Sequence, residues 1–260
     1  MTEALLNYFH HYFLNNAEKQ SFISQPPGPA ILLWSNKNSV PNLTGISIVR
    51  QLEAESYNNN QLNALNNINF VAQNIIRETQ IPFLNIEYDI DNEILIINNK
   101  QFDLEEGGRI IAQNFQLEVD NTITKTINNS QSVIDPFHLW SRNYFSGSKV
   151  TKIDLDMVVL NASNTISSIV EIKRSAKTQF DNWQPYQADN VNYRMLFNLS
   201  ENLDIPFFTV HHNEVQNPII DSQKLLNIYA FNSPDIMEWN EFRAIENRQQ
   251  ITVEQLVHLL

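Results

Sequence analysis

The chain has 260 residues, of which 42% are hydrophobic and 10% aromatic, a composition typical of a globular protein with a substantial core. It has no cysteine, which excludes disulfide bonds, thiolate metal sites and cysteine nucleophiles. Its 17 basic and 29 acidic residues give a formal net charge of −12, whereas proteins that bind nucleic acid are usually basic. Local basic patches and bound cations can still reverse the field at one site.

Two features bear on the location of the protein. No apolar run reaches the length that crosses a membrane. The segment Met1 to Leu14 lacks a basic start and contains Glu3, so it is expected to form an amphipathic helix and not a signal peptide. Together with the absence of cysteine, these observations favour a cytoplasmic location and no membrane partner.

In the first half of the chain, the spacing of hydrophobic residues predicts helices and two short strands. Helices are expected over Thr2 to Lys19, Ile46 to Glu55, Gln61 to Thr79 and Leu104 to Leu117, and strands over Phe83 to Tyr88 and Glu93 to Ile97. The polar stretch Thr122 to Ser132 is the candidate boundary between an N-terminal α+β region (residues 1–125), for DNA recognition or dimerisation, and a second region (residues 126–260). No internal repeat is evident.

The second region is expected to alternate helices and strands. A short helix over Pro136 to Phe145 precedes a hairpin, whose strands cover Val150 to Leu160 and Ile166 to Arg174. Further expected elements are a helix from Trp183 to about Glu201, strands over Phe207 to His211 and Leu225 to Phe231, and a terminal helix over Val253 to Leu260.

The hairpin concentrates charged residues on one face. Side chains alternate along a strand, so Asp154 and Asp156 are expected on one face of the first strand, and Glu171 and Lys173 on one face of the second. Three carboxylates on a rigid surface favour a hard cation, Mg²⁺ or Mn²⁺. A lysine beside such a cation can orient water or stabilise charge on a phosphate.

The order of these residues resembles the signature of the PD-(D/E)XK nucleases. The resemblance rests on an aspartate, the apolar run Met157 to Leu160 after it, a loop, and then Val170-Glu171-Ile172-Lys173. It covers roughly Pro136 to His212. It implies an α/β fold with a restriction-endonuclease-like core, a mixed central sheet flanked by helices. It also implies one or two Mg²⁺ ions and hydrolysis of DNA phosphodiester bonds by a restriction or phage-defence endonuclease.

The chain departs from this signature in one respect and leaves one residue open. No proline precedes either aspartate, since Ile153 and Leu155 stand there. Both Asp154 and Asp156 remain candidate metal ligands and catalytic residues with Glu171; Asp156 is favoured because the apolar run follows it directly.

The helix expected after the hairpin carries polar and aromatic residues that could line a cleft. Gln187 is a candidate catalytic residue that would contact a metal-bound water or a phosphate, and a purely structural role is equally open for it. For Tyr193 a place in the core is favoured. The basic residues Arg142, Lys149, Lys152, Arg174 and Lys177 could contact phosphates or be ordinary surface charge.

Three other interpretations stay open at this point. The charged residues could be the solvated face of an exposed hairpin, with weak surface ion pairs. The fold could be an inactive nuclease scaffold that only binds, or it could hydrolyse RNA or nucleotides with the same metal chemistry. The expected partner is DNA, with RNA and a homodimer as further possibilities.

Overall fold

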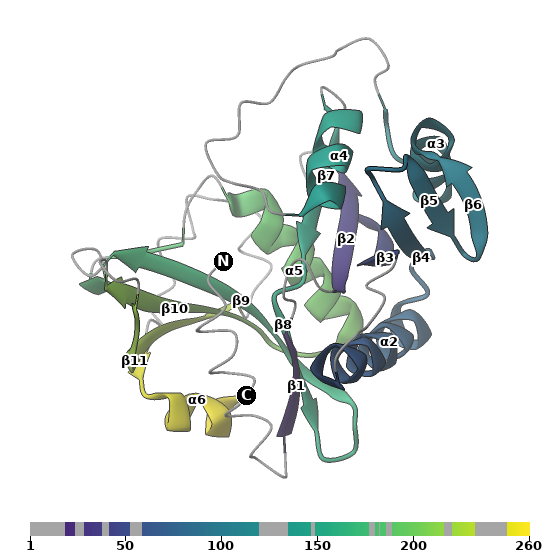
Figure 1. Ribbon diagram of the computed structural model, residues 1–260. Coiled ribbons are helices and arrows are strands. Elements are labelled where there is room, and N and C mark those ends of the chain that lie inside the picture. The colour runs from purple at the N-terminus through teal and green to yellow at the C-terminus, as the bar shows by residue number, and fades with distance from the viewer. Residues whose placement is uncertain are drawn as a thin grey trace. The chain divides into compact units, whose positions relative to one another are not determined.

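The computed structural model describes residues 19–23, 29–37, 42–52, 59–119, 135–146, 149–176, 180–181, 183–185, 189–215, 220–231 and 249–260. Within these residues the protein is a mixed α/β protein with two mixed sheets flanked by helices (Figure 1). The chain divides into two compact units: unit 1 consists of Met1–Ile23 and Leu155–Leu260, and unit 2 of Ser24–Asp154.

The sheet of unit 2 has the spatial order β6-β5-β4-β3-β2-β7. Its strands are β2 (Ala30–Asn36), β3 (Leu43–Gln51), β4 (Phe83–Asp89), β5 (Ile94–Ile97), β6 (Lys100–Asp103) and β7 (Val150–Asp154). Neighbouring strands are antiparallel except β3 and β4, which are parallel and have helix α2 (Asn59–Thr79) between them in the chain.

Two further helices belong to unit 2, α3 (Leu104–Asn114) and α4 (Pro136–Tyr144). Each begins at an aspartate whose side chain accepts a hydrogen bond from a free backbone N–H of the first turn: Asp103 from Glu106 at 2.7 Å and Asp135 from His138 at 3.0 Å. Figure 1 shows α3 beside β5 and β6. The helices expected over Leu104 to Leu117 and Pro136 to Phe145 are therefore confirmed.

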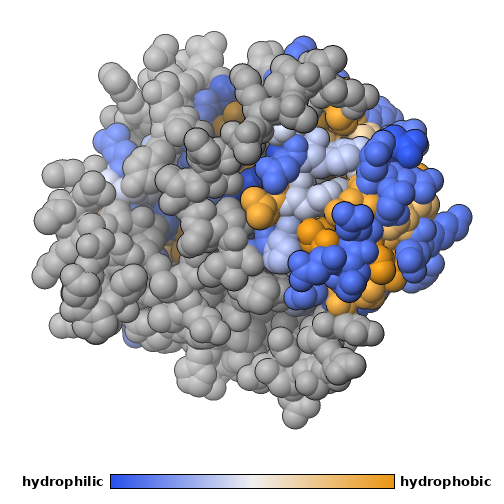
Figure 2. Space-filling model, turned by 45° about the horizontal axis from the view of Figure 1, so that its top comes forward, coloured by the Kyte–Doolittle hydropathy of each residue, from blue (hydrophilic) through white to orange (hydrophobic). Residues whose placement is uncertain are grey.

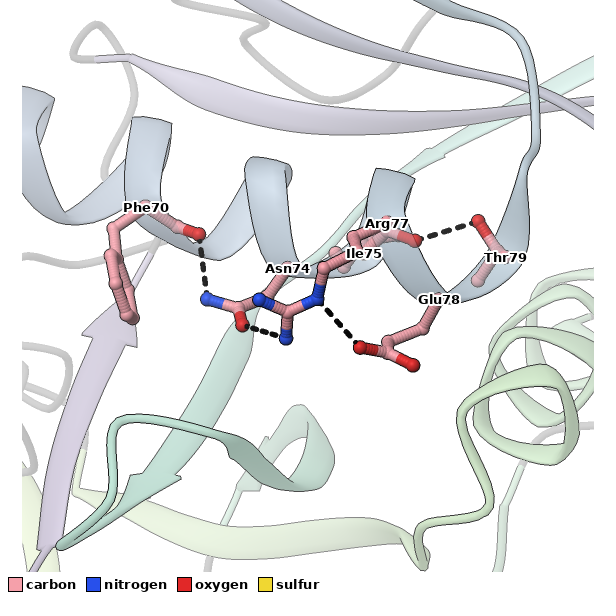
Figure 3. Close-up of polar contacts among 6 residues, drawn as sticks. All are labelled: Phe70, Asn74, Ile75, Arg77, Glu78 and Thr79. Atoms are coloured by element: carbon pink, nitrogen blue, oxygen red, sulfur yellow. Dashed lines mark hydrogen bonds and ion pairs between the residues drawn. The ribbon is translucent and has the colours of Figure 1, made fainter.

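Helix α2 confirms the helix expected over Gln61 to Thr79, and polar side chains organise its C-terminal end (Figure 3). Asn74 Nδ2 donates to the Phe70 carbonyl oxygen at 2.9 Å, and the Arg77 guanidinium donates to Asn74 Oδ1 at 2.9 Å and to Glu78 Oε1 at 2.7 Å. The helix ends at Thr79, and the next residue, Gln80, adopts a positive φ of 56°. A left-handed residue of this kind commonly terminates a helix.

The helix expected over Ile46 to Glu55 is wrong, because residues up to Gln51 form strand β3. Apolar residues at Ile46, Ile48 and Val49 fit either a helix or a buried strand. Pairing decides the outcome, since β3 lies between β2 and β4 with both edges hydrogen-bonded. The strands expected over Phe83 to Tyr88 and Glu93 to Ile97 are confirmed as β4 and β5.

The sheet of unit 1 has the order β1-β8-β9-β10-β11-β12. Its strands are β1 (Lys19–Ile23), β8 (Met157–Asn161), β9 (Ile166–Ala176), β10 (Phe207–Val215), β11 (Ile220–Phe231) and β12 (Gln249–Ile251). Its helices are α5 (Asn190–Leu203) and α6 (Val253–Leu259), and Figure 1 shows α6 beside β11. Only β9 and β10 are parallel.

Several expected elements of this half are confirmed and two are corrected. The strands after the hairpin and the terminal helix are present as β10, β11 and α6. The helix expected from Trp183 begins only at Asn190. The single strand expected over Val150 to Leu160 is broken at Leu155 and Asp156: β7 pairs with β2 in unit 2, whereas β8 pairs with β1 and β9 in unit 1.

The expected division into residues 1–125 and 126–260 does not coincide with the two units, because α4 and β7 belong to unit 2 and β1 to unit 1. The helix expected over Thr2 to Lys19 lies outside the described residues except for Lys19, which begins β1. The polar stretch Thr122 to Ser132 also lies outside them.

Both units repeat one order of elements, although no repeat was expected from the sequence. Unit 2 contains β2-β3-α2-β4-β5-β6-α3 and unit 1 contains β8-β9-α5-β10-β11-β12-α6, with the same pairing directions throughout. One edge strand of each sheet comes from a distant part of the chain: β7, from the second half, pairs with β2, and β1, from the first half, pairs with β8. Topology is conserved between the units while the side chains differ.

Large hydrophobic side chains are mostly buried in the part of the chain that the structure describes; the exposed ones there are Phe70, Leu139 and Leu259. Figure 2 shows one face, on which hydrophobic side chains lie among hydrophilic ones. None of the described helices combines the length and the apolar character that crossing a membrane requires.

Candidate functional site

The antiparallel pair β8 and β9 carries the predicted charged residues of unit 1. Val170 and Ile172 belong to the hydrophobic cluster on one face of the sheet, so Glu171 and Lys173 lie together on the other face. The expectation that these two residues share a face is confirmed. The charged face is not solvated, because Glu171 is only 7% exposed.

Asp156 lies next to these residues, directly before β8. Met157 pairs with Val170, which places Asp156 opposite Glu171 in the continued register. The Ile172 backbone N–H donates to Asp156 Oδ2 at 2.8 Å, and Asp156 is 4% exposed. The structure thus brings Asp156 beside Glu171 on rigid backbone, and one carboxylate oxygen of Asp156 is fixed by a peptide N–H.

Lys173 is held between two carboxylates. Its Nζ lies 2.8 Å from Glu171 Oε1 and 2.9 Å from Asp189 Oδ2, at the N-terminal end of α5. It also lies 5.5 Å from the centroid of the Tyr193 ring. Burial alone would lower the pKa of this ammonium group, but the neighbouring carboxylates, Glu171 above all, outweigh burial and raise its pKa above the ordinary value. Lys173 is therefore fully charged at neutral pH.

The donor set suits a hard divalent cation. Asp156, directly before β8, and Glu171, in β9, offer carboxylate oxygens, and Mg²⁺ is commonly held by one or two carboxylates with waters and substrate phosphate oxygens. No group of three or more histidine, aspartate or glutamate side chains suited to a metal is present among the described residues. The residues present thus fit a cation that two carboxylates hold and that keeps open positions for a substrate.

Asp154 belongs to the other unit, two residues before Asp156. It ends β7, pairs with Leu32 of β2, and belongs to unit 2. The expected strand with Asp154 and Asp156 on one face is therefore not formed, because the chain leaves one sheet at Asp154 and enters the other at Met157. Asp154 ends strand β7 in unit 2, and Asp156 lies in the break between β7 and β8, in unit 1.

Asp154 has basic neighbours in unit 2. Lys152 Nζ lies 2.9 Å from His138 Nδ1, which joins β7 to α4. Burial, followed by the positive charge of Arg142, lowers the pKa of Lys152 to about 7, although Asp154 and Asp135 act in the opposite direction. Burial and then Lys152 lower the pKa of His138 to about 4, so this imidazole is neutral at pH 7.

Other residues singled out by the sequence are placed as follows. Gln187 and Lys177 lie outside the described residues, as does the side chain of Arg174. Arg142 is exposed on α4, and Lys149 forms an exposed ion pair with Glu118 at 3.7 Å.

The aromatic and histidine residues near the site belong to the core of unit 1. Tyr193 is fully buried and stacks on Phe231, as expected. His211 is also fully buried and stacks on Trp183, with ring centroids 4.1 Å apart. The Asn227 amide lies 3.1 Å from His211 Nδ1.

Two residues of these clusters were missed as functional candidates. Neither Asp189 nor His138 is among the candidate site residues predicted from the sequence. Each meets its lysine through a contact between a helix and a strand, across 16 residues for Asp189 and 14 for His138. Local spacing in the sequence carries no signal for such contacts.

A scan against models of protein families found no match to this chain, and searches of curated proteins and of solved structures found none either.

Proposed function

We propose that unit 1 has a restriction-endonuclease-like core and is a nuclease of the PD-(D/E)XK type that hydrolyses DNA phosphodiester bonds with Mg²⁺ or Mn²⁺, in restriction or phage defence. The observation that carries the proposal is the convergence of Asp156, Glu171 and Lys173 on one buried face of β8 and β9. A cytoplasmic location is part of the proposal and agrees with the absence of cysteine.

The order of elements supports this choice. The hairpin β8 and β9 carries the three residues, α5 follows, and β10 returns parallel to β9. Strand, hairpin, strand, helix and strand is also the order in the nuclease family that the sequence resembles. The burial of Asp156 and Glu171 argues against the interpretation of the hairpin as a solvated face.

Each of the three residues has a distinct role in the proposal. Asp156 and Glu171 would hold the cation through their carboxylate oxygens. A cation bound there polarises a phosphate and lowers the pKa of bound water. Lys173, fully charged and held by Asp189, is positioned to donate hydrogen bonds to a phosphate oxygen or to the attacking water.

The net charge of −12 favours a local site over broad binding of DNA. A bound divalent cation compensates the charges of Asp156 and Glu171, so substrate affinity should depend on the cation as well as on basic side chains. The RNA and nucleotide alternatives use the same chemistry and are outcomes of the experiment below.

The experiment is incubation of the purified protein with supercoiled, linear and single-stranded DNA and with RNA, in Mg²⁺, Mn²⁺, Ca²⁺ or EDTA. We expect cleavage of DNA with Mg²⁺ or Mn²⁺ only. Asp156→Asn and Glu171→Gln should lose cation binding and cleavage, whereas Lys173→Met should keep cation binding and lose about 10²–10³-fold in rate. Circular dichroism at the assay temperature verifies that each variant is folded.

Asp154→Asn separates the two candidate aspartates, because Asp154 ends β7 in unit 2 and Asp156 precedes β8 in unit 1. We expect it to cleave like the wild type. If wild type and Lys173→Met gave the same result on every nucleic acid, and EDTA did not change it, the nuclease proposal would be contradicted. The fold would then be a scaffold that only binds. Cleavage of RNA alone would replace DNA as the substrate.

A further inference from the structure

The repeated topology allows residues of the two units to be matched one by one. In both units a helix is followed by a left-handed residue, Gln80 or Asp204, and the sequence Ile-Pro-Phe comes directly after it. The first strand of the parallel pair then makes the same backbone hydrogen bond: Ile46 N–H to the Pro82 carbonyl at 2.9 Å, and Ile169 N–H to the Pro206 carbonyl at 3.1 Å. Ile46 and Ile169 are thus equivalent positions.

The hydrophobic cores follow the same equivalence. Residues of the two sheets were matched by counting along each strand from Ile46 and Ile169, and residues of the last helices by counting from the N-caps Asp103 and Thr252. This places core residues of one unit on core residues of the other. The matched pairs are Leu32 with Met157, Trp34 with Val159, Val49 with Ile172, Leu84 with Phe208, Ile86 with Val210, Leu95 with Leu226, Ile97 with Ile228 and Ile111 with Leu260. Agreement over eight pairs supports two copies of one structural unit.

The opposite faces of the two sheets differ. Ile31 pairs with Ile48 in unit 2, at the positions of Asp156 and Glu171 in unit 1. Arg50 stands at the position of Lys173 and forms its ion pair with Glu87 of the neighbouring strand β4. Ile31 and Ile48 are buried, so this face of the sheet carries apolar side chains in unit 2 where it carries two carboxylates in unit 1.

We infer that the chain is an internal duplication with one catalytic copy, unit 1, and one copy, unit 2, that has lost the cation ligands, so that one chain cuts one strand of a DNA duplex at a time. This inference rests on the proposed function. Isoleucine has no oxygen to offer a cation, and a hard cation requires oxygen ligands. At the position of the catalytic lysine, unit 2 has Arg50, whose guanidinium is paired with Glu87.

Each cut consumes one water: its oxygen forms a bond to phosphorus, the bond from phosphorus to the leaving strand end breaks, and the leaving oxygen takes up a proton. Cutting both strands at the same time with one chain requires a second set of carboxylates in that chain. At the matched positions of unit 2, that set is absent. The product of one encounter is therefore a nick.

The first experiment follows supercoiled plasmid with Mn²⁺ and the full chain at a concentration well below that of the plasmid. We expect open circles to accumulate before any linear DNA forms. The matched variants are Lys173→Met and Arg50→Met, at equivalent positions of the two copies. Lys173→Met should lose about 10²–10³-fold in the nicking rate, and Arg50→Met should stay within about twofold of the wild type.

The second experiment measures Mn²⁺ binding by electron paramagnetic resonance, without nucleic acid. We expect Glu171→Gln to lose the tight sites and Arg50→Met to keep them. Three outcomes would overturn the single catalytic copy and leave the nuclease proposal standing. They are tight Mn²⁺ binding that survives in Glu171→Gln, an equal loss of cleavage in Lys173→Met and Arg50→Met, and linear DNA that forms without an open-circle intermediate. Absence of any Mn²⁺-dependent cleavage by the wild type would overturn both.

Discussion

Lys173 in unit 1 and Lys152 in unit 2 are both largely removed from solvent, yet their surroundings have opposite effects. Lys173 lies between Glu171 and Asp189, and its pKa is raised despite burial. Lys152 meets the neutral ring of His138, and burial lowers its pKa to about 7. Burial penalises an ammonium group in either place, so the partner decides whether the charge persists.

The two lysines also differ in whether they keep their charge near neutral pH. A lysine that must act on a phosphate near neutral pH has to remain charged, and two carboxylates secure this for Lys173. Near Lys152 and His138, by contrast, burial outweighs the neighbouring carboxylates of Asp135 and Asp154 and lowers both pKa values. The same residue type therefore has a raised pKa in one unit and a lowered pKa in the other.

The largest effect is expected from removal of the Lys173 ammonium group. Lys173→Met leaves Glu171 and Asp189 without their shared counter-charge, and loss of one partner of a buried ion pair costs about 3 kcal/mol. Urea denaturation in EDTA measures the free energy of unfolding. The control is Arg77→Met, whose exposed pair with Glu78 contributes about 0.5 kcal/mol or less. Equal losses in both variants would contradict the comparison.

The next effect is a pH dependence that originates at His138. Its pKa is lowered to about 4 by burial and by Lys152, below the ordinary value of 6.5, so the unfolded chain binds the proton more tightly. The free energy of unfolding should therefore rise as pH increases from about 4 to about 6.5, by about 1–2 kcal/mol more in the wild type than in His138→Gln. Parallel stability curves of the two proteins over this range would contradict the assignment.

A smaller effect is expected at Asp189, because Lys173 keeps Glu171 when this carboxylate is lost. Asp189→Asn should destabilise by about 1 kcal/mol. Combining it with Lys173→Met should recover part of the loss that Lys173→Met causes, since one uncompensated carboxylate disappears. A double-mutant cycle measures this coupling. Strict additivity of the two changes would show that Asp189 and Lys173 do not interact.

The smallest effect is expected for Lys152→Met at pH 7. The substitution relieves the cost of burying an amine and at the same time removes the donor to His138 Nδ1. These two contributions oppose each other, so the free energy of unfolding should change by no more than about 1 kcal/mol. A loss as large as that of Lys173→Met would mean that Lys152 is charged and paired in the native state.

The sequence by itself determined the local features of the site. Alternation along Val170 to Lys173 separated Glu171 and Lys173 from Val170 and Ile172, and the structure has them on opposite faces. The helices α2 and α4 were also predicted with nearly their observed bounds. The patterns behind these predictions act within a few residues, so a sequence reveals them directly.

Tertiary structure decided what depends on distant partners. The same alternation suggested one strand from Val150 to Leu160, but β7 and β8 bond to different strands, and the break separates Asp154 from Asp156. Residues around Ile46 fit helix and strand alike until β2 and β4 supplied hydrogen bonds on both sides. The repeat of one topology in two units was likewise visible only once the strands were paired, although the segment Ile-Pro-Phe after α2 and after α5 is a short trace of it in the sequence. The contact of Asp189 with Lys173 leaves no local pattern in the sequence, because side-chain packing selects partners by proximity in space.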